Sequence, residues 1–167
     1  KAENLTVENS RQLLNQTTIN LEDYLRNMRR ISDAMYYTVI KNTDIGSGSL
    51  DDSMTLLYES NKDKLVSVAC YTNDGNLVAA SPIDTEKTEI DVTSQSWFKD
   101  AVGELENFHF SKPHVENLFD DPSYRYYWVV SLSRTVELTR NGVSMLGVLL
   151  VDMNYSSIEQ LLDKANS

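Results

Sequence analysis

A carboxyl group stands at the end of the most apolar segment of the chain. Asp152 directly follows residues 143–151, and burying a charge there costs free energy unless something pairs with it. Such a carboxylate either caps the next helix or binds something. Capping fits Asn154 better, because Asn154 stands directly before the helical pattern that begins at Tyr155. Asp152 is therefore a candidate ligand-binding residue.

Aromatic and polar side chains alternate along a second predicted strand, residues 126–136. Successive side chains of a strand point to opposite faces. One face therefore carries Tyr127, Ser131 and Ser133, and the other carries Tyr126, Trp128 and Arg134. The pattern does not decide which face meets a ligand, so residues of both faces are candidates. Arg134 could hold an anionic ligand or pair with Asp152; the alternative is a solvated or salt-bridged strand end.

Two histidines lie near a proline that ends a short predicted strand. His109 and His114 are five residues apart, and Asp120 and Asp121 follow them in the chain. This spacing matches no established metal-ligand motif, so we expect loop roles and no bound metal. Ser111 and His114 are candidates for the mouth of a pocket.

The composition argues against several classes of function. The formal net charge is −10, which repels phosphate backbones and anionic lipid headgroups, so we expect no nucleic-acid partner. The sequence contains no nucleophile elbow, phosphate-binding loop, dinucleotide fingerprint or zinc-protease motif. We therefore expect a domain that is not an enzyme and holds no cofactor. A metal-dependent hydrolase, the alternative, would need His109 and His114 clustered with Asp120 or Asp121. The single cysteine, Cys70, is expected to be a small buried apolar side chain.

A long helix is predicted at the start of the chain, over residues 1–42. No Gly precedes Gly46 and no Pro precedes Pro82, so nothing interrupts it. Apolar side chains recur every seven residues, at Val7, Leu14, Leu21, Met28 and Met35. At 1.5 Å per residue such a helix is roughly 60 Å long, more than a small domain is wide. We expect it to pack partly on its own domain and to offer a surface through which two copies could form a homodimer.

An α+β body is predicted over residues 43–153, followed by a C-terminal helix over 154–167. The expected strands are residues 65–72, 77–80, 108–110, 126–136 and 143–153, and the expected helices of the body are residues 50–59 and 91–103. Thr93 or Ser94 is expected to cap the second of these helices. The Asp74-Gly75 and Asn141-Gly142 pairs predict tight hairpin turns, which join antiparallel strands. The prediction is a single domain in which helices flank an antiparallel sheet.

Five segments in this order resemble the Cache family: "TNDGNLVAASP", "SQSWFKDA", "FHFSKPH", "YYWVVSLSRTV" and "NGVSMLGVLLVDMN". Cache domains are PAS-like extracytoplasmic sensor domains of histidine kinases, chemoreceptors and diguanylate cyclases. The chain is most similar to the sensor region of Gram-positive histidine kinases, as a single Cache domain or as half of a double one. The resemblance implies a small-molecule sensor on the extracellular face of the membrane, held by membrane helices outside residues 1–167. The alternatives are the sensor of a chemoreceptor or a cyclase, or a dimerisation module without a ligand.

The resemblance also implies roles for individual residues. It places Trp97 in the wall of a pocket and makes Asp152 an acceptor for ligand amines or hydroxyls. Cache domains that bind amino acids carry an Arg two residues before this Trp, which grips the ligand carboxylate; here that position is Gln95. Gln is neutral and cannot form a charge-assisted bidentate pair. The expected ligand is therefore a sugar, an organic acid or an amine, in preference to an amino acid.

Overall fold

The body of the protein is a six-stranded antiparallel sheet. The computed structural model describes residues 2–123 and 127–166. The strands are β1 (Leu65–Thr72), β2 (Leu77–Ser81), β3 (His109–Phe110), β4 (His114–Val115), β5 (Trp128–Arg140) and β6 (Val143–Asn154). Their order across the sheet is β2-β1-β6-β5-β3, with β4 also pairing with β5. The predicted α+β fold is confirmed, and β4 is a strand that the sequence did not indicate.

Two tight turns set the pairing of the long strands. Gly75 has φ 88°, and Asn141 and Gly142 have φ 52° and 81°. Gly adopts this left-handed region without steric cost and Asn does so more readily than most residues. The chain therefore reverses through two residues between β5 and β6 and through the four residues 73–76 between β1 and β2. β5 continues to Arg140, four residues beyond its predicted end, because it stays paired with β6 up to the turn.

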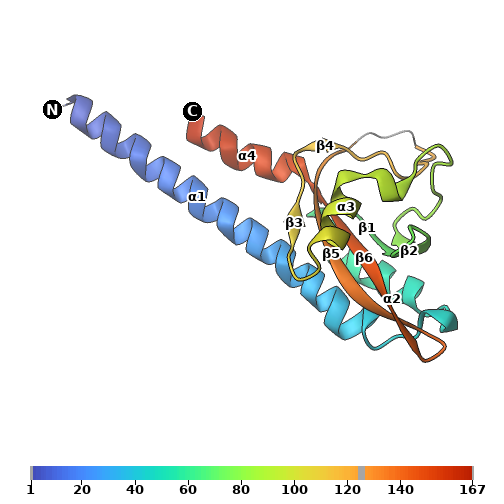
Figure 1. Ribbon diagram of the computed structural model, residues 1–167. Coiled ribbons are helices and arrows are strands. Elements are labelled where there is room, and N and C mark those ends of the chain that lie inside the picture. The colour runs from blue at the N-terminus through green and yellow to red at the C-terminus, as the bar shows by residue number, and fades with distance from the viewer. Residues whose placement is uncertain (1, 124–126, 167) are drawn as a thin grey trace.

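The long helix packs on the sheet along only part of its length. It comprises α1 (Ala2–Ala34) and a π-helical segment (Met35–Ile40). Met28 and Met35 are fully buried in the core, whereas Leu14, on the same seven-residue repeat, is 55% exposed. The first half of α1 therefore extends past the sheet, as Figure 1 shows. The predicted long helix is confirmed, with its last six residues in π-helical geometry.

The two faces of the sheet bear separate cores. One core joins α1 and α2 (Leu50–Ser60) to the sheet and includes Cys70, which is buried as expected and whose thiol pKa burial raises to about 12. The other core joins α3 (Ser96–Gly103) to the opposite face through Trp97 and Phe98. Every candidate ligand contact must therefore be assigned to one of the two faces.

The predicted helix over residues 91–103 is wrong in its first half. A single 3-10 turn, Val92–Ser94, precedes α3, and extended backbone at Gln95 separates the two. The turn is capped by Asp91, whose carboxylate accepts a hydrogen bond from the Thr93 backbone N–H at 3.0 Å. Neither Thr93 nor Ser94 is a cap, because the Asp91 side chain already satisfies the free Thr93 N–H.

The last helix, α4 (Tyr155–Asn166), lies beside α1 and runs in the opposite direction (Figure 1). Asn154 caps it as expected, since its side chain accepts a hydrogen bond from the Ser156 N–H at 3.0 Å. Tyr24 ties α1 to this junction by donating to the Asn154 carbonyl at 3.3 Å. Among the helices of residues 2–123 and 127–166, none is both long enough and apolar enough to span a bilayer.

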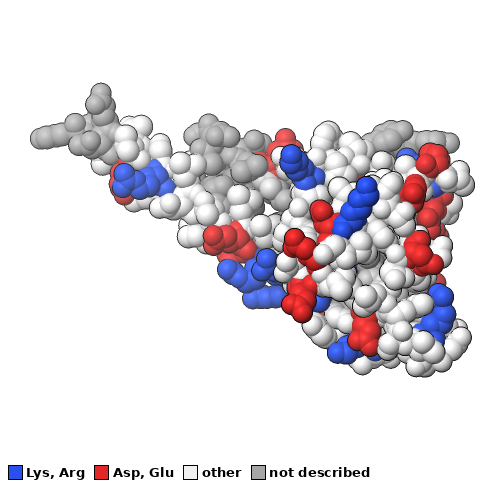
Figure 2. All heavy atoms as spheres, in the orientation of Figure 1, with Lys and Arg blue, Asp and Glu red and all other residues white. Residues whose placement is uncertain are grey.

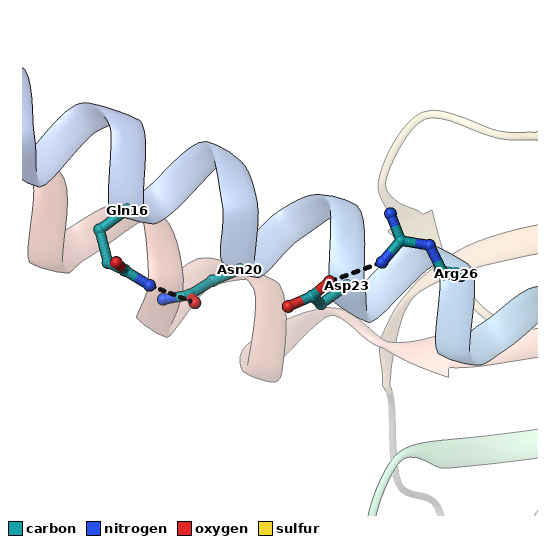
Figure 3. A network of polar contacts seen from close by, with 4 residues as sticks. All are labelled: Gln16, Asn20, Asp23 and Arg26. Atoms are coloured by element: carbon teal, nitrogen blue, oxygen red, sulfur yellow. Dashed lines mark hydrogen bonds and ion pairs between the residues drawn. The ribbon is translucent and has the colours of Figure 1, made fainter.

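Short polar pairs line the exposed side of α1. Gln16 donates to Asn20 at 3.1 Å, and Arg26 pairs with Asp23 at 2.7 Å, both within one helical turn (Figure 3). Side chains three or four residues apart in a helix face each other, and each such pair adds a few tenths of a kcal/mol, about 0.2–0.5. These pairs stabilise the extended helix locally and make no contact with the sheet.

Candidate functional site

The register of the sheet places two serines on either side of one carboxyl group. β6 is flanked by β1 and β5, and Asp152 lies opposite Ser67 of β1 and Ser131 of β5. The Ser131 hydroxyl donates to Asp152 Oδ1 at 2.5 Å, and the Ser67 hydroxyl donates to Oδ2 at 3.4 Å. Asp152 is only 1% exposed. A carboxyl group near the end of the most apolar strand is thus held by hydroxyl donors.

The chain between β3 and β4 completes this network. His114 Nε2 lies 3.4 Å from the Ser131 hydroxyl, and His114 Nδ1 lies 3.3 Å from the Ser111 hydroxyl. Ser111 also accepts a hydrogen bond from the Ser131 backbone N–H at 2.9 Å. The structure therefore joins four predicted site residues, Ser111, His114, Ser131 and Asp152, in one connected group on the face of the sheet that α3 covers. Sequence reasoning missed Ser67.

Burial dominates the electrostatics of this group. It raises the pKa of Asp152 to about 7; the hydrogen bond from Ser131 opposes the rise, and the nearby Glu116 carboxylate adds to it. Burial also raises the pKa of Glu116, although the Leu118 N–H donates to its Oε1 at 2.6 Å. Two carboxyl groups at low dielectric next to each other favour any cation that can reach them.

Tyr71 adds a polar atom without a partner. Its side chain is fully buried, and its hydroxyl has no hydrogen-bond partner among the described residues. The ring packs on Trp97 with centroids 5.6 Å apart. Burial raises the pKa of Tyr71 most, and the carboxylates of Glu86, Asp152 and Glu116 raise it further. A buried phenol left unsatisfied costs about 1–3 kcal/mol.

A cavity opens next to this group. Its volume is about 320 Å³, and Tyr58, Ser67, Ile83, Glu116, Phe119 and Tyr127 contribute to its lining. Ser67 is the member of the network in the cavity wall, and Asp152 lies one hydrogen bond behind it. An outer cleft of about 830 Å³ continues from it past Glu116 and Phe119. The polar network is therefore reached from a space large enough for a small organic molecule.

Trp97 and Tyr127, both predicted to contact a ligand, differ in their position relative to this cavity. Trp97 is 5% exposed and belongs to the core that supports Tyr71, and its carbonyl accepts a hydrogen bond from Ser133 at 2.8 Å. Tyr127 lines the cavity directly. Tyr126, another predicted site residue, falls outside the described residues.

Arg134 and Trp128 lie away from the network. Arg134 pairs with Asp33 of α1 at 2.6 Å, and its guanidinium lies over the rings of Tyr36 and Phe108, 4.9 and 4.6 Å from their centroids. Arg134 therefore does not pair with Asp152, because its side chain lies on the face of β5 that points toward α1, and the alternative of a salt-bridged residue is the one observed. Trp128 is 55% exposed and borders a separate hollow at the start of α4.

The residue types of this network resemble those of a hydrolase, but their order does not. In a catalytic triad the histidine lies between serine and aspartate and takes the serine proton. Here the Ser131 hydroxyl lies between His114 and Asp152 and donates to the carboxyl group, and it is 1% exposed. The group can hold a proton and satisfy a bound molecule; it does not activate a nucleophile.

The two histidines do not form a metal centre. His109 Nε2 contacts the Glu104 carbonyl at 3.1 Å, away from the group that contains His114. Within the part of the chain that the structure describes, no three His, Cys, Asp or Glu side chains are arranged to hold a metal ion.

The chain resembles known proteins in structure and not in sequence. No protein-family model and no curated protein sequence matches this chain. Among solved structures, the ligand-binding domain of the Campylobacter jejuni chemoreceptor Tlp3 in complex with L-valine superposes with a TM-score of 0.72 at 17% identity, over 96% of this chain and 64% of that one.

Two further receptors are similar over comparable lengths. The ligand-binding domain of the Pseudomonas aeruginosa amino-acid chemoreceptor PctC, in complex with GABA, gives a TM-score of 0.67 at 16% identity, over 97% of this chain and 65% of that one. The domain of the Pseudomonas fluorescens chemoreceptor CtaA, in complex with L-serine, gives 0.64 at 13%, over 89% and 59%. The chain thus spans about three fifths of these domains and has the fold of chemoreceptor ligand-binding domains.

Proposed function

We propose that this chain is the small-molecule-binding module of a transmembrane receptor, exposed outside the cytoplasm, and that it is not itself an enzyme. The observation that carries the proposal is the buried Ser67–Asp152–Ser131–His114 network behind a cavity of about 320 Å³. A dimerisation module without a ligand would fill this space with its own side chains. The unsatisfied hydroxyl of Tyr71 points the same way, since a bound molecule would give it a partner.

The receptor is proposed to be a chemoreceptor in preference to the histidine kinase expected from the sequence. All three neighbours described above are chemoreceptor domains, and their folds match over nearly the whole of this chain. Pairing of two copies through the exposed side chains of α1, such as Val7 and Leu14, stays a prediction that sedimentation at several protein concentrations measures.

The ligand is proposed to carry an ammonium group. The inner cavity is lined by Glu116 and Asp121 and by no Lys or Arg among the described residues, and Asp152 lies behind it. This charge disfavours an organic acid. The ligands bound in the three neighbouring structures, L-valine, GABA and L-serine, all contain an amine. Ser67, Glu116 and the ring of Tyr127 are the groups that would meet it.

Isothermal titration with amines, amino acids, sugars and organic acids tests the proposal. An amine-containing compound is expected to bind, and Glu116→Gln is expected to weaken it on the order of tenfold or more, because a charged partner in a desolvated site is lost. Glu106→Gln is the matched control, since Glu106 is exposed and lines neither cavity. Binding of sugars or acids alone, or equal effects of the two variants, would refute the assignment of this cavity.

A further inference from the structure

We propose that an amine bound in the inner cavity exchanges for a proton on Asp152, and that the Ser67 hydroxyl is the contact through which the two positive charges compete. This exchange rests on the proposed function and adds a regulation to it, because the domain then holds its ligand more tightly as the pH rises. The position of Asp152, the donors that hold it and the side chain that separates it from the cavity lead to it.

Asp152 is a carboxyl group without a cation of its own. It is 1% exposed, and its two oxygens accept hydrogen bonds from the Ser131 hydroxyl of β5 and the Ser67 hydroxyl of β1. No ion pair among residues 2–123 and 127–166 includes it. Surface carboxylates differ, because on the face shown in Figure 2 they lie among Lys and Arg side chains. Two neutral donors stabilise a buried anion less than a cation does, so the ligand-free site favours the protonated carboxyl group.

The titratable groups around Asp152 do not supply the missing charge. His114 and Glu116, on β4 and directly after it, act in opposite directions: His114 lowers the pKa of Asp152 and Glu116 raises it. Tyr71 faces Asp152 from β1 and is neutral, because burial raises the pKa of its phenol. Lys87 lowers the pKa of Glu116. Burial has the largest influence on Asp152 and raises its pKa to about 7.

The Ser67 hydroxyl is the point at which a ligand reaches this carboxyl group. Ser67 lies in the wall of the cavity of about 320 Å³, and its oxygen is 3.4 Å from Asp152 Oδ2. A hydroxyl group has one proton and two lone pairs, so Ser67 can donate to Asp152 and accept an ammonium N–H from the cavity at the same time. The ammonium charge then lies one side chain away from the carboxyl group at low dielectric, where it favours the ionised form.

Binding therefore exchanges one cation for another. The O–H bond of the Asp152 carboxyl group breaks, the carboxylate keeps the electron pair, and the proton is released to the buffer. The ammonium group keeps all of its protons. The Ser131 hydroxyl and His114 Nε2, 3.4 Å apart, connect the carboxyl group to a half-buried side chain from which the proton can reach solvent. A ligand without a positive charge gives no such exchange.

Titration calorimetry of the folded domain in buffers of different ionisation enthalpy counts the protons exchanged. The probes are butylamine and 4-aminobutyrate. Because the pKa of the free carboxyl group is about 7, we expect about 0.8 proton released per amine bound at pH 6 and almost none at pH 8.5. Over the same range we expect the affinity to rise roughly tenfold. Proton uptake, a count near zero at pH 6 or an affinity that does not change would overturn the exchange.

Substitutions separate Asp152 from the other carboxyl group of the cavity. Asp152→Asn is expected to bind the probes more weakly than the native protein at pH 8.5, and the gap should close roughly tenfold by pH 6. Protons that this variant still releases come from Glu116, whose pKa burial also raises. Glu106→Gln, exposed and outside both cavities, is the matched control and should behave as the native protein does. If Asp152→Asn releases as many protons as the native protein, Asp152 is not the group that exchanges.

Ser67→Ala tests the contact itself. It removes the oxygen that joins the ammonium group to Asp152, so we expect several-fold weaker binding of the probes and fewer protons released at pH 6. Weaker binding with the full proton count would show that Asp152 loses its proton without Ser67, which overturns the role given to this hydroxyl.

The outcomes keep the exchange distinct from the proposed function. If an amine binds and Glu116→Gln weakens it, but no proton is released, the amine site stands and the exchange is overturned. If neither probe binds, the exchange is overturned as well, and the proposed function fails with it when no other amine binds either.

Discussion

Replacing Asp152 by Asn is expected to stabilise the ligand-free domain at high pH and to have little pH-dependent effect at low pH. Burial raises the pKa of the Asp152 carboxyl from 3.8 to about 7, so between these values the folded state binds a proton that the unfolded state has lost. Stability then falls as the pH rises through this window, because the folded state must give up that proton. Below about pH 4 the group is neutral in both states and its cost disappears.

The size of the effect follows from the shift. About three pKa units at 1.36 kcal/mol each give a destabilisation on the order of 4 kcal/mol once the pH lies above 7. Asn is isosteric and uncharged: its oxygen accepts the Ser131 hydrogen bond and its NH₂ group reaches the Ser67 hydroxyl. In a domain of 167 residues 1 kcal/mol corresponds to about 2–4 °C, so the advantage of the variant should grow by roughly 10 °C between pH 4.5 and pH 8.5.

Differential scanning calorimetry of the native protein and the variant across this pH range measures the effect. The test is how the difference in melting temperature between the variant and the native protein changes with pH, since any altered packing contributes equally at every pH. Asp100→Asn, at an exposed position, serves as the control and is expected to give a flat difference. A flat difference for Asp152→Asn as well, or one that shrinks as the pH rises, would refute the reasoning that burial governs this carboxyl group.

Three further experiments probe the scaffold. Gly147→Ala would place a methyl group 2.5 Å from a backbone oxygen of β1, so we expect a loss of about 1–3 kcal/mol in urea unfolding, whereas Gly103→Ala meets open space and should be neutral or stabilising. A double-mutant cycle of Arg134→Met and Asp33→Asn should give a coupling of about 1 kcal/mol; a value near zero would contradict the ion pair. Asp44 accepts hydrogen bonds from three backbone N–H groups, and these lower the pKa of its carboxyl group. Asp44→Asn is therefore expected to lower the urea midpoint at neutral pH. The midpoints of the variant and the native protein should converge as the pH falls, because the native carboxylate then becomes protonated.

The fold was predictable because its signals are local. The seven-residue spacing up to Met35, the Asp74-Gly75 turn and the Asn141-Gly142 turn each depend on neighbours in the chain, and the structure follows them. β4 was missed because it consists of only His114 and Val115, too short to show a strand pattern. The start of α3 was misplaced since the extended backbone at Gln95 leaves no mark on an otherwise helical sequence.

Residues of the candidate site could be predicted only where the pattern of a single strand indicated them. Alternation along β5 placed Ser131 correctly, and the position of Asp152 after an apolar strand marked it as unusual. Ser67 and Glu116 were missed, because their nearness to Asp152 depends on how β1 registers against β6 and on the path of a loop. The role of Arg134 stayed open for the same reason: the pattern gives two faces, and only packing against α1 decides which face is which.

The two faces of β5 also have a mechanical consequence. Ser133 is fixed to the face that α3 covers through the Trp97 carbonyl, and the next residue, Arg134, is fixed to Asp33 near the end of α1. From Asp33 back to the start of α1 the helix measures about 50 Å at 1.5 Å per residue. A rod of that length swings its far end by nearly 1 Å for each degree of tilt at its base. A tilt of one or two degrees at its base therefore displaces the far end of α1 by about 1–2 Å, as much as helices move at interfaces between subunits.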